Sequence, residues 1–278
     1  GPHYPPYMAY PQMYGAETVE YQLHSTDQWK PDFSDIRAKM DDDVRLLVLI
    51  NPNNPCGSVC GPDDIDALLA IARDFPNCIV VADEIYDGLD FTGEQVSVAS
   101  RSTDVPVIAL NGVSKVYYAP GWRIGYMALH DPQRRLTLVR DGLERLLRSR
   151  LCASTPAQMG YLAGLEGDRG WMEVYAKRVQ QQRDHCLRRI QGIDGLEVEH
   201  PGGAFYMFIR LTDERWAADD KAFVLDLLHE EHVLLVHGSG FSPDLGKGHV
   251  RLVYLADVSV LDEVFDRIDR FLKKHRQG

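Results

Sequence analysis

The chain has 278 residues, of which 45% are hydrophobic and 26% charged, and its formal net charge at pH 7 is -11. This length supports one large or two moderate domains, and the composition excludes a disordered or low-complexity chain. The acidic balance repels phosphate backbones and anionic lipid, so we expect no nucleic-acid partner. No run approaches the roughly 18 apolar residues that a membrane helix needs, so we expect no membrane partner and a cytoplasmic location.

The first forty residues contain prolines but no long periodic run, which predicts loops and short strands. Residues 45–50 and 78–82 are continuous apolar runs, and residues 62–75 between them have apolar positions at helical spacing. This strand, helix, strand order predicts a βαβ unit. Residues 107–110 and 124–129 add two more apolar strands, which we expect to be buried in the interior of the sheet. The predicted class is α/β, with a mostly parallel sheet sandwiched by helices.

The second half of the chain changes to long helices followed by short strands. Helices are predicted at residues 132–148, 156–166 and 171–190, and later at 221–230 and 259–275. Strands are predicted at residues 196–199, 204–209, 233–236 and 250–254. This order is typical of a smaller α+β domain. We therefore expect a large domain over residues 1–182 and a small C-terminal domain over residues 183–278.

The five cysteines are an odd number and are scattered along the sequence, which indicates reduced thiols rather than a disulfide framework. They show no paired spacing typical of a metal knuckle, so no structural metal is expected. Cys56 lies in a tight turn, and we interpret it as a small turn residue rather than a reactive thiol.

Three polar motifs each follow an apolar strand, at the sheet edge where α/β proteins bind ligands. They are the turn NPNNPCG at residues 51–57, Asp83 in ADEIYDG, and Lys115 in NGVSKVYYAPGWRIGY. Taken singly, each has an ordinary explanation: a turn, a helix cap and a solvated lysine. A lysine among apolar strands is nevertheless unusual, because burying its ammonium group is costly. That cost lowers the pKa of the lysine and favours the neutral, nucleophilic amine. The three motifs together indicate an active site with a Schiff-base lysine.

These motifs, with PGGAFY and GHVRL further along, resemble the pyridoxal-phosphate enzymes of fold type I, specifically the class I and II aminotransferases of the aspartate and alanine type. The resemblance covers essentially the whole chain, and all five motifs occur in the family's order. It implies an enzyme with pyridoxal 5'-phosphate as cofactor, which moves an amino group between an L-amino acid and a 2-oxo acid.

The resemblance also implies a role for each matching residue. Lys115 matches the lysine that forms the Schiff base and moves the proton. Asp83 matches the carboxylate that keeps the cofactor's ring nitrogen protonated. Asn54 and Tyr86 match the hydrogen-bond donors to its phenolic oxygen, and Asn54 also lies on the substrate side.

Four further positions follow from the same resemblance. Ser114 and Arg123 match the groups that bind the phosphate, and Arg251 matches the arginine that takes the substrate's α-carboxylate. Tyr4 matches the aromatic residue that stacks on the cofactor ring. The chain departs from a common pattern at Gly112, where a second phosphate-binding serine is frequent.

Two alternative functions remain open on the sequence. One is a carbon–sulfur β-lyase on the same fold, because fold does not determine the reaction. The other is a non-catalytic module or inactive fragment, because relatives begin well upstream of the point that matches Gly1. The resemblance implies a homodimer when the chain is complete, and a chain beginning at Gly1 is expected to be poorly soluble or weakly folded and to have little transaminase activity.

Overall fold

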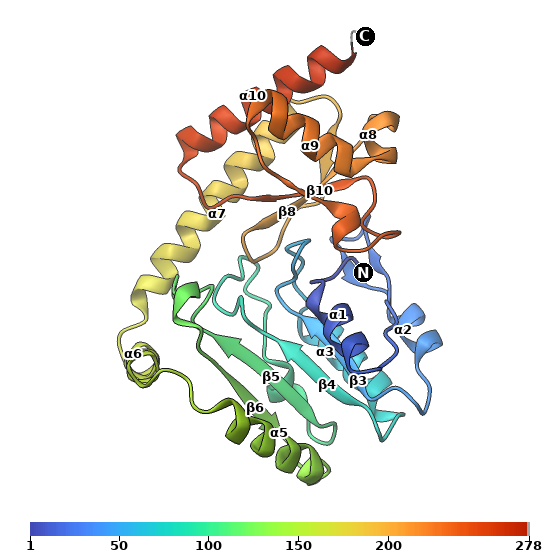
Figure 1. Cartoon of the computed structure of the whole chain (residues 1–278), viewed down its shortest axis with the longest axis vertical. Helices are drawn as coiled ribbons and strands as arrows, with labels where there is room; N and C mark the ends of the chain where they lie inside the picture. The colour runs from blue at the N-terminus through green and yellow to red at the C-terminus, as the bar shows by residue number, and fades with distance from the viewer. Residues whose placement is uncertain (277–278) are drawn as a thin grey trace. The chain divides into compact units, whose positions relative to one another are not determined.

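The computed structural model describes residues 1–276 and divides the chain into two compact units (Figure 1). Unit 1 contains residues 1–35, residues 53–58 and the chain from Ala176 onward. Unit 2 contains residues 36–52 and 59–175. The helix α7 (Gly170–Gln191) runs from one unit into the other. The division expected from the sequence, at residue 182, stays a prediction.

Unit 2 is built on a four-stranded sheet in the order β3-β4-β5-β6. The first three strands are parallel and β6 pairs antiparallel with β5. The strands are β3 (Leu46–Ile50), β4 (Ile79–Asp83), β5 (Val107–Gly112) and β6 (Gly125–His130). The helices are α3 (Pro62–Arg73), α4 (Val98–Arg101), α5 (Thr137–Arg150) and α6 (Thr155–Glu166), with a 3-10 turn, η1, at Pro120–Trp122.

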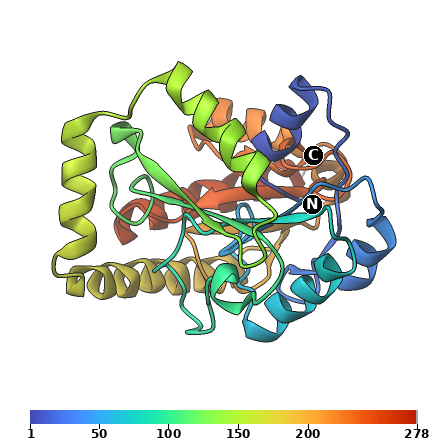
Figure 2. The same cartoon turned by 90° about the horizontal axis from the view of Figure 1, so that it is seen from below.

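Helices α3 and α5 lie on opposite sides of this sheet (Figure 2). Helix α3 begins with a proline at its first position, where the missing N–H costs nothing, and the Asp64 carboxylate accepts the Gly61 N–H at 3.0 Å. Its apolar face is buried through Ile65, Leu68 and Leu69. The mostly parallel sheet between helices confirms the predicted α/β class.

Residues 124–129 were predicted to form a buried strand, and the predicted burial is wrong. Strand β6 forms as expected, but Tyr126 and Met127 are 46% and 47% exposed. Within residues 1–276, the strand lies at the sheet edge and pairs with β5 alone. An apolar run predicts a strand, but it does not identify which element covers that strand.

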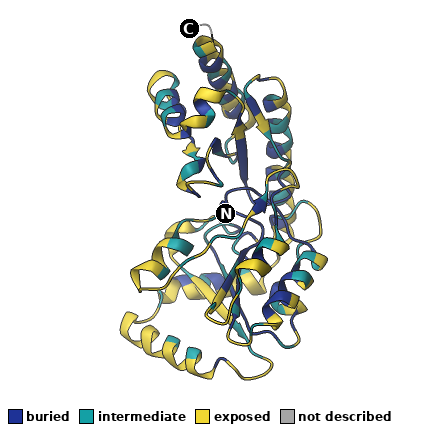
Figure 3. Ribbon diagram, turned by 90° about the vertical axis from the view of Figure 1, so that its right-hand side faces the viewer, coloured by how far each residue is buried: buried dark blue, intermediate teal, exposed yellow. Residues whose placement is uncertain are grey.

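Unit 1 contains a four-stranded antiparallel sheet in the order β7-β8-β10-β9. The strands are β7 (Leu196–Val198), β8 (Tyr206–Leu211), β9 (Val236–His237) and β10 (His249–Val253), and the helices are α8 (Glu214–Ala218), α9 (Asp220–Glu231) and α10 (Val258–Arg276). Helix α10 buries Leu261, Phe265, Ile268 and Leu272, which recur at helical spacing along one face. Figure 3 shows the buried strands in dark blue against the exposed outer faces of the helices in yellow. This arrangement confirms the predicted α+β character.

The expectation of only loops and short strands in the first forty residues is wrong. Short strands do form at β1 (Leu23–His24) and β2 (Lys30–Pro31), but helices form at α1 (Pro6–Met13) and α2 (Phe33–Lys39). Helix α1 contains Pro11 and buries none of its residues, so its sequence carries no apolar stripe that would predict it. No helix within residues 1–276 is long and apolar enough to cross a membrane.

Candidate active site

The loop that follows β3 is held by side-chain amides. Within unit 2, Asn51 accepts the Cys60 N–H and donates to the Cys60 carbonyl, both at 2.9 Å. Within unit 1, the Gly203 N–H donates to the Gly57 carbonyl at 2.9 Å. Gly57 has φ +72°, and a Cβ there would lie 2.7 Å from Pro201 Cβ. Only glycine fits this position, because the backbone is left-handed and closely covered.

This loop places Asn54 against β10 within unit 1. Nη1 of Arg251 donates a hydrogen bond to Oδ1 of Asn54 at 2.7 Å, although the two residues are 197 positions apart. Asn54 is buried, while Arg251 is half-buried. The structure therefore brings together the two residues expected on the substrate side.

In unit 2, the predicted residues gather after two adjacent parallel strands. Asp83 is the last residue of β4 and pairs in register with Leu110 of β5, the strand that leads into Ser114 and Lys115. Nζ of Lys115 lies 5.9 Å from the centre of the Tyr86 ring, which is buried. Asp83 Oδ1 accepts the Ile85 N–H at 3.2 Å. An amine, a carboxylate and a phenol thus lie at the carboxyl end of this sheet.

The turn between β5 and β6 explains the unexpected glycine at position 112. Gly112 pairs with Gly125, and a Cβ at Gly112 would lie 2.9 Å from the Ile124 carbonyl oxygen. A serine side chain has no room there without a backbone shift. Arg123, in the left-handed region at φ +51°, donates from Nη1 to the Pro120 carbonyl at 2.8 Å. Its side chain is exposed.

Two other predicted positions have simpler surroundings. Tyr4 belongs to unit 1, is 43% exposed and makes an edge contact with Tyr7 at 6.3 Å. Its expected stacking on a cofactor stays a prediction. Cys56 is fully buried, and burial raises the pKa of its thiol well above the ordinary value. This environment keeps the thiol protonated and therefore unreactive, which agrees with our interpretation of Cys56 as a small turn residue.

The sequence interpretation did not single out two aromatic residues that contact Arg251. The guanidinium carbon lies 4.6 Å from the ring centre of Tyr206 and 4.6 Å from that of Phe241. Tyr206 ends the PGGAFY motif, and Phe241 ends the glycine-rich segment HGSGF at residues 237–241. The sequence signal that could have indicated these two residues is an aromatic residue at the end of each glycine-containing segment.

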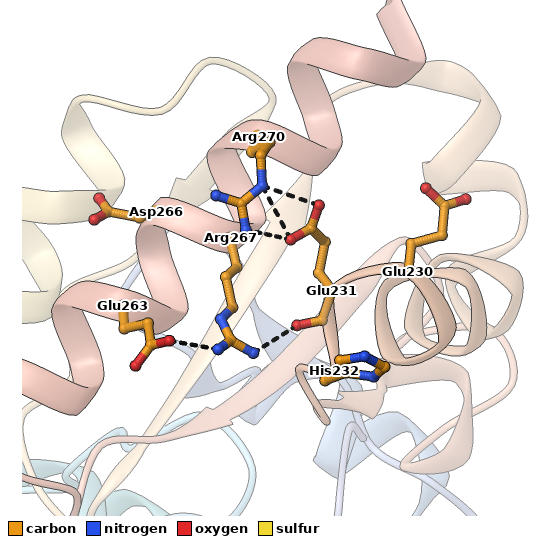
Figure 4. A pocket seen from close by; sticks show the side chains of 7 residues that line it. All are labelled: Glu230, Glu231, His232, Glu263, Asp266, Arg267 and Arg270. Carbon is orange, nitrogen blue, oxygen red and sulfur yellow. Dashed lines mark hydrogen bonds and ion pairs between the residues drawn. The ribbon is translucent and has the colours of Figure 1, made fainter.

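A cavity of about 410 Å³ lies elsewhere in unit 1, between α9 and α10 (Figure 4). Arg270 forms an ion pair with Glu231, and Arg267 donates to the Glu231 carbonyl at 2.9 Å. These charges are paired with one another across the cavity, and none of the predicted site residues lines it. The cavity therefore adds no chemistry to the candidate site. Within residues 1–276, no cluster of His, Cys, Asp and Glu is arranged to hold a metal ion.

Comparison with known proteins identifies the class to which this fold and site belong. The chain matches the family described as aminotransferase class I and II over residues 1–268, and it belongs to that family. It is 36% identical to the glutamate-pyruvate aminotransferases of Haemophilus influenzae and Escherichia coli, over 99% of this chain and 69% of each relative. It is 33% identical to the alanine aminotransferase of Mycobacterium tuberculosis, of which it covers 65%.

Solved structures give the same result. An alanine aminotransferase from Pyrococcus furiosus superposes with a TM-score of 0.95 at 43% identity, covering 99% of this chain and 69% of that one. An aminotransferase from Escherichia coli gives a TM-score of 0.91 at 35% identity, covering 98% of this chain and 68% of that one. The fold is that of the fold type I aminotransferases. The protein is an aminotransferase acting on amino and 2-oxo acids, and these comparisons give the lyase alternative no support.

Members of this family use pyridoxal phosphate, and the side chains after β4 and β5 fit it chemically. Lys115 offers an amine for an aldehyde, Asp83 a carboxylate for a pyridinium nitrogen and Tyr86 a phenol for a phenolate. Ser114 and Arg123 offer a hydroxyl and a guanidinium for a phosphate. Each functional group of the cofactor therefore has a matching partner type within unit 2.

Proposed function

We propose that the protein is an alanine aminotransferase that transfers the amino group of alanine to 2-oxoglutarate, giving pyruvate and glutamate, with Lys115 as the residue that would hold pyridoxal phosphate. The substrate pair is supported by relatives whose names specify glutamate, pyruvate and alanine. The lysine is supported by one observation above all. Asp83 and the segment that leads into Lys115 end two adjacent parallel strands, and Lys115 Nζ lies 5.9 Å from the Tyr86 ring.

The division of labour follows from the chemistry of each side chain. The bound cofactor would supply an electron sink for the charge that develops when the substrate's Cα loses its proton. Lys115 would hold the cofactor and then, once displaced, accept that proton at Nζ. Asp83 would keep a positive charge on the ring by pairing with it. Ser114 and Arg123 would anchor the phosphate.

Unit 1 would supply the groups that bind and orient the substrate. Arg251 carries a planar fork of donors suited to a carboxylate, and its hydrogen bond to Asn54 fixes one arm of that fork. Orientation over the reacting atoms supplies much of an enzyme's rate enhancement. Within unit 2, Tyr86 would hydrogen-bond the cofactor's phenolic oxygen. The match to the family's motifs implies the further roles of Asn54 and Tyr4 as a second donor to that oxygen and a ring that stacks on the cofactor. We further propose that the protein works as a homodimer in the cytoplasm, where its five unpaired cysteines would remain reduced.

The lysine assignment can be tested by borohydride reduction of the cofactor-loaded protein, followed by peptide mapping. The expected result is a cofactor fixed to the peptide that contains Lys115. Lys177 is a matched control lysine outside the motif, and Lys177→Ala should leave labelling unchanged while Lys115→Ala abolishes it. Label on another lysine would contradict the assignment.

The substrate assignment can be tested with a panel of amino donors. Alanine and glutamate should give the highest kcat/KM, with pyruvate and 2-oxoglutarate as acceptors. Higher kcat/KM for aspartate or an aromatic donor would contradict the alanine assignment while leaving the lysine assignment intact.

A further inference from the structure

Arg251 lies over two buried aromatic rings within unit 1. Its guanidinium carbon is 4.6 Å from the ring centres of both Tyr206 and Phe241, and each ring residue is 4% exposed. A guanidinium within about 6 Å of a ring centre is attracted by the negative face of the ring. The two rings belong to different elements, β8 and the segment after the 3-10 turn η2 (Gly238–Gly240). We call these two rings the aromatic clamp.

The register of the sheet places Tyr206 beside the arginine. Strands β8 and β10 are antiparallel, with Arg251 opposite Phe208 and Val253 opposite Tyr206. Tyr206 is therefore a diagonal neighbour of Arg251 on the same face, within reach of a long side chain. The backbone pairing, rather than the arginine itself, determines where this ring lies.

Packing that does not involve Arg251 holds Phe241. Its ring makes an edge contact with Phe208 at 6.0 Å, and it belongs to a buried cluster with Leu23, Trp29 and Cys56. Its backbone N–H donates to the Gly238 carbonyl at 2.8 Å. A ring fixed in this way forms part of a rigid surface on which the guanidinium rests.

We propose that the aromatic clamp positions the guanidinium that binds the substrate's α-carboxylate, with Tyr206 and Phe241 as positioning residues that act through Arg251. This inference rests on the proposed role of Arg251. The Asn54 hydrogen bond directs one arm of the guanidinium, and the two rings restrict where its carbon can lie. The two buried rings also place apolar surface beside the charge, and less polar surroundings strengthen its attraction for a carboxylate. Preorganisation of this kind lowers the entropy lost on binding.

The clamp should affect every carboxylate ligand equally and leave cofactor loading unchanged. Tyr206→Met and Phe241→Met each replace a ring by a flexible apolar chain of similar reach. We expect each to raise KM for every amino donor and the inhibition constant of propionate by about 5- to 30-fold, with a smaller change in kcat. Tyr206→Phe keeps the ring and should stay within about twofold of the wild type.

A matched control separates positioning from general packing. Phe223 is fully buried in unit 1, where its ring packs on Trp216 and Phe271, and it is not one of the two clamp rings. Phe223→Met should lower the Tm and leave the propionate inhibition constant unchanged. If one clamp variant fails to fold, the other still tests whether the clamp positions Arg251. A folded clamp variant with wild-type affinity for propionate would overturn the inference.

Arg251→Ala distinguishes this inference from the proposed function beneath it. If Arg251→Ala leaves propionate inhibition unchanged, the proposed role of Arg251 fails. If Arg251→Ala weakens inhibition and neither clamp variant does, the role of Arg251 stands and the clamp inference fails.

Discussion

Arg251 and Asn54 form a hydrogen bond of 2.7 Å that joins β10 to the loop after β3 within unit 1. The Asn54 amide oxygen is a neutral acceptor, so it orients the guanidinium without cancelling its charge. A carboxylate in its place would pair with the guanidinium as an ion and compete with the substrate. The neutral amide is therefore the side chain that suits a carboxylate-binding arginine.

The first prediction concerns this amide. Asn54→Asp preserves the shape of the side chain but adds a negative charge beside Arg251. We expect KM for every amino donor to rise by about 10-fold or more, because the new ion pair with Arg251 competes with the substrate's carboxylate; about 10-fold corresponds to about 1.4 kcal/mol. Steady-state kinetics with several donors would measure this. Wild-type KM values in Asn54→Asp would show that Arg251 does not bind the carboxylate here.

The second prediction concerns the carboxylate at the end of β4. Asp83→Asn keeps the size of the side chain and removes its charge, so kcat should fall by about 10²- to 10³-fold, as it does when one preorganised electrostatic partner is lost. Cofactor absorbance should fall much less. The neighbouring Glu84 is a matched control, because burial raises its pKa and it accepts the Val98 N–H at 2.8 Å. Glu84→Gln should change the Tm but leave kcat near the wild-type value, and equal kcat losses in both variants would refute a special role for Asp83.

The third prediction concerns the glycine that closes the loop carrying Asn54. At Gly57, an added Cβ meets Pro201 Cβ at 2.7 Å and the Tyr206 carbonyl oxygen at 2.9 Å. We expect Gly57→Ala to destabilise the fold by about 2 kcal/mol or more, since strain and overpacking both contribute. Gly15 shares the positive φ but has open space around it, so Gly15→Ala should cost about 1 kcal/mol. Chemical denaturation would measure both, and equal losses would mean that the close contacts at Gly57 relax freely.

The sequence predicts most of this architecture because buried strands and amphipathic helices carry strong periodic signals. The apolar runs at β3, β4 and β5 and the helical spacing of α3 all correspond to observed elements. Helix α1 was missed because it buries nothing, so no hydrophobic pattern marks it. The exposure of β6 was missed because an apolar run does not identify its neighbours.

In the candidate site, too, some features can be predicted from the sequence and others cannot. Motifs along the chain predict Lys115 and Asp83, since Asp83 ends one apolar strand and Lys115 follows shortly after another. The contact between Asn54 and Arg251 spans 197 positions, and no local pattern predicts it. The rings of Tyr206 and Phe241 lie beside Arg251 through strand register and cluster packing, which are properties of the folded chain alone. Sequence therefore predicts the reacting groups better than the groups that orient them.

The fourth prediction concerns thiol reactivity. Cys56 is buried and burial holds its pKa well above the ordinary value, whereas Cys152 is exposed. Because the thiolate is the reactive species, a thiol reagent should modify Cys152 in the native protein and reach Cys56 only after denaturation. Mass spectrometry of the labelled peptides would measure this. Rapid native labelling of Cys56 would show that the turn after β3 opens, contrary to its tight packing.

The last prediction concerns the pH dependence of stability through His249. Its ring stacks on Phe208, with centres 4.9 Å apart and planes 1° apart, and its Nδ1 lies 3.0 Å from the Lys247 carbonyl oxygen. Burial lowers the pKa of this imidazole below its ordinary value of 6.5, and the positive charge of Arg210 lowers it further. Hydrogen bonding to backbone carbonyls and the nearby Asp220 act in the opposite direction without overcoming burial.

Because the folded pKa is the lower one, the unfolded chain binds the proton more readily than the folded chain. The stability contributed by the neutral ring is therefore complete above about pH 6.5 and is lost as the pH falls toward the folded pKa. We expect the Tm to fall between about pH 7.5 and pH 5.5, and to fall less in His249→Phe, which keeps a stacked ring without a titrating group. His200, whose pKa is also lowered by burial, is present in both proteins, so its contribution cancels in the comparison. Calorimetry at the two pH values would measure the difference, and an identical fall in Tm for both proteins would show that His249 takes up no proton on unfolding.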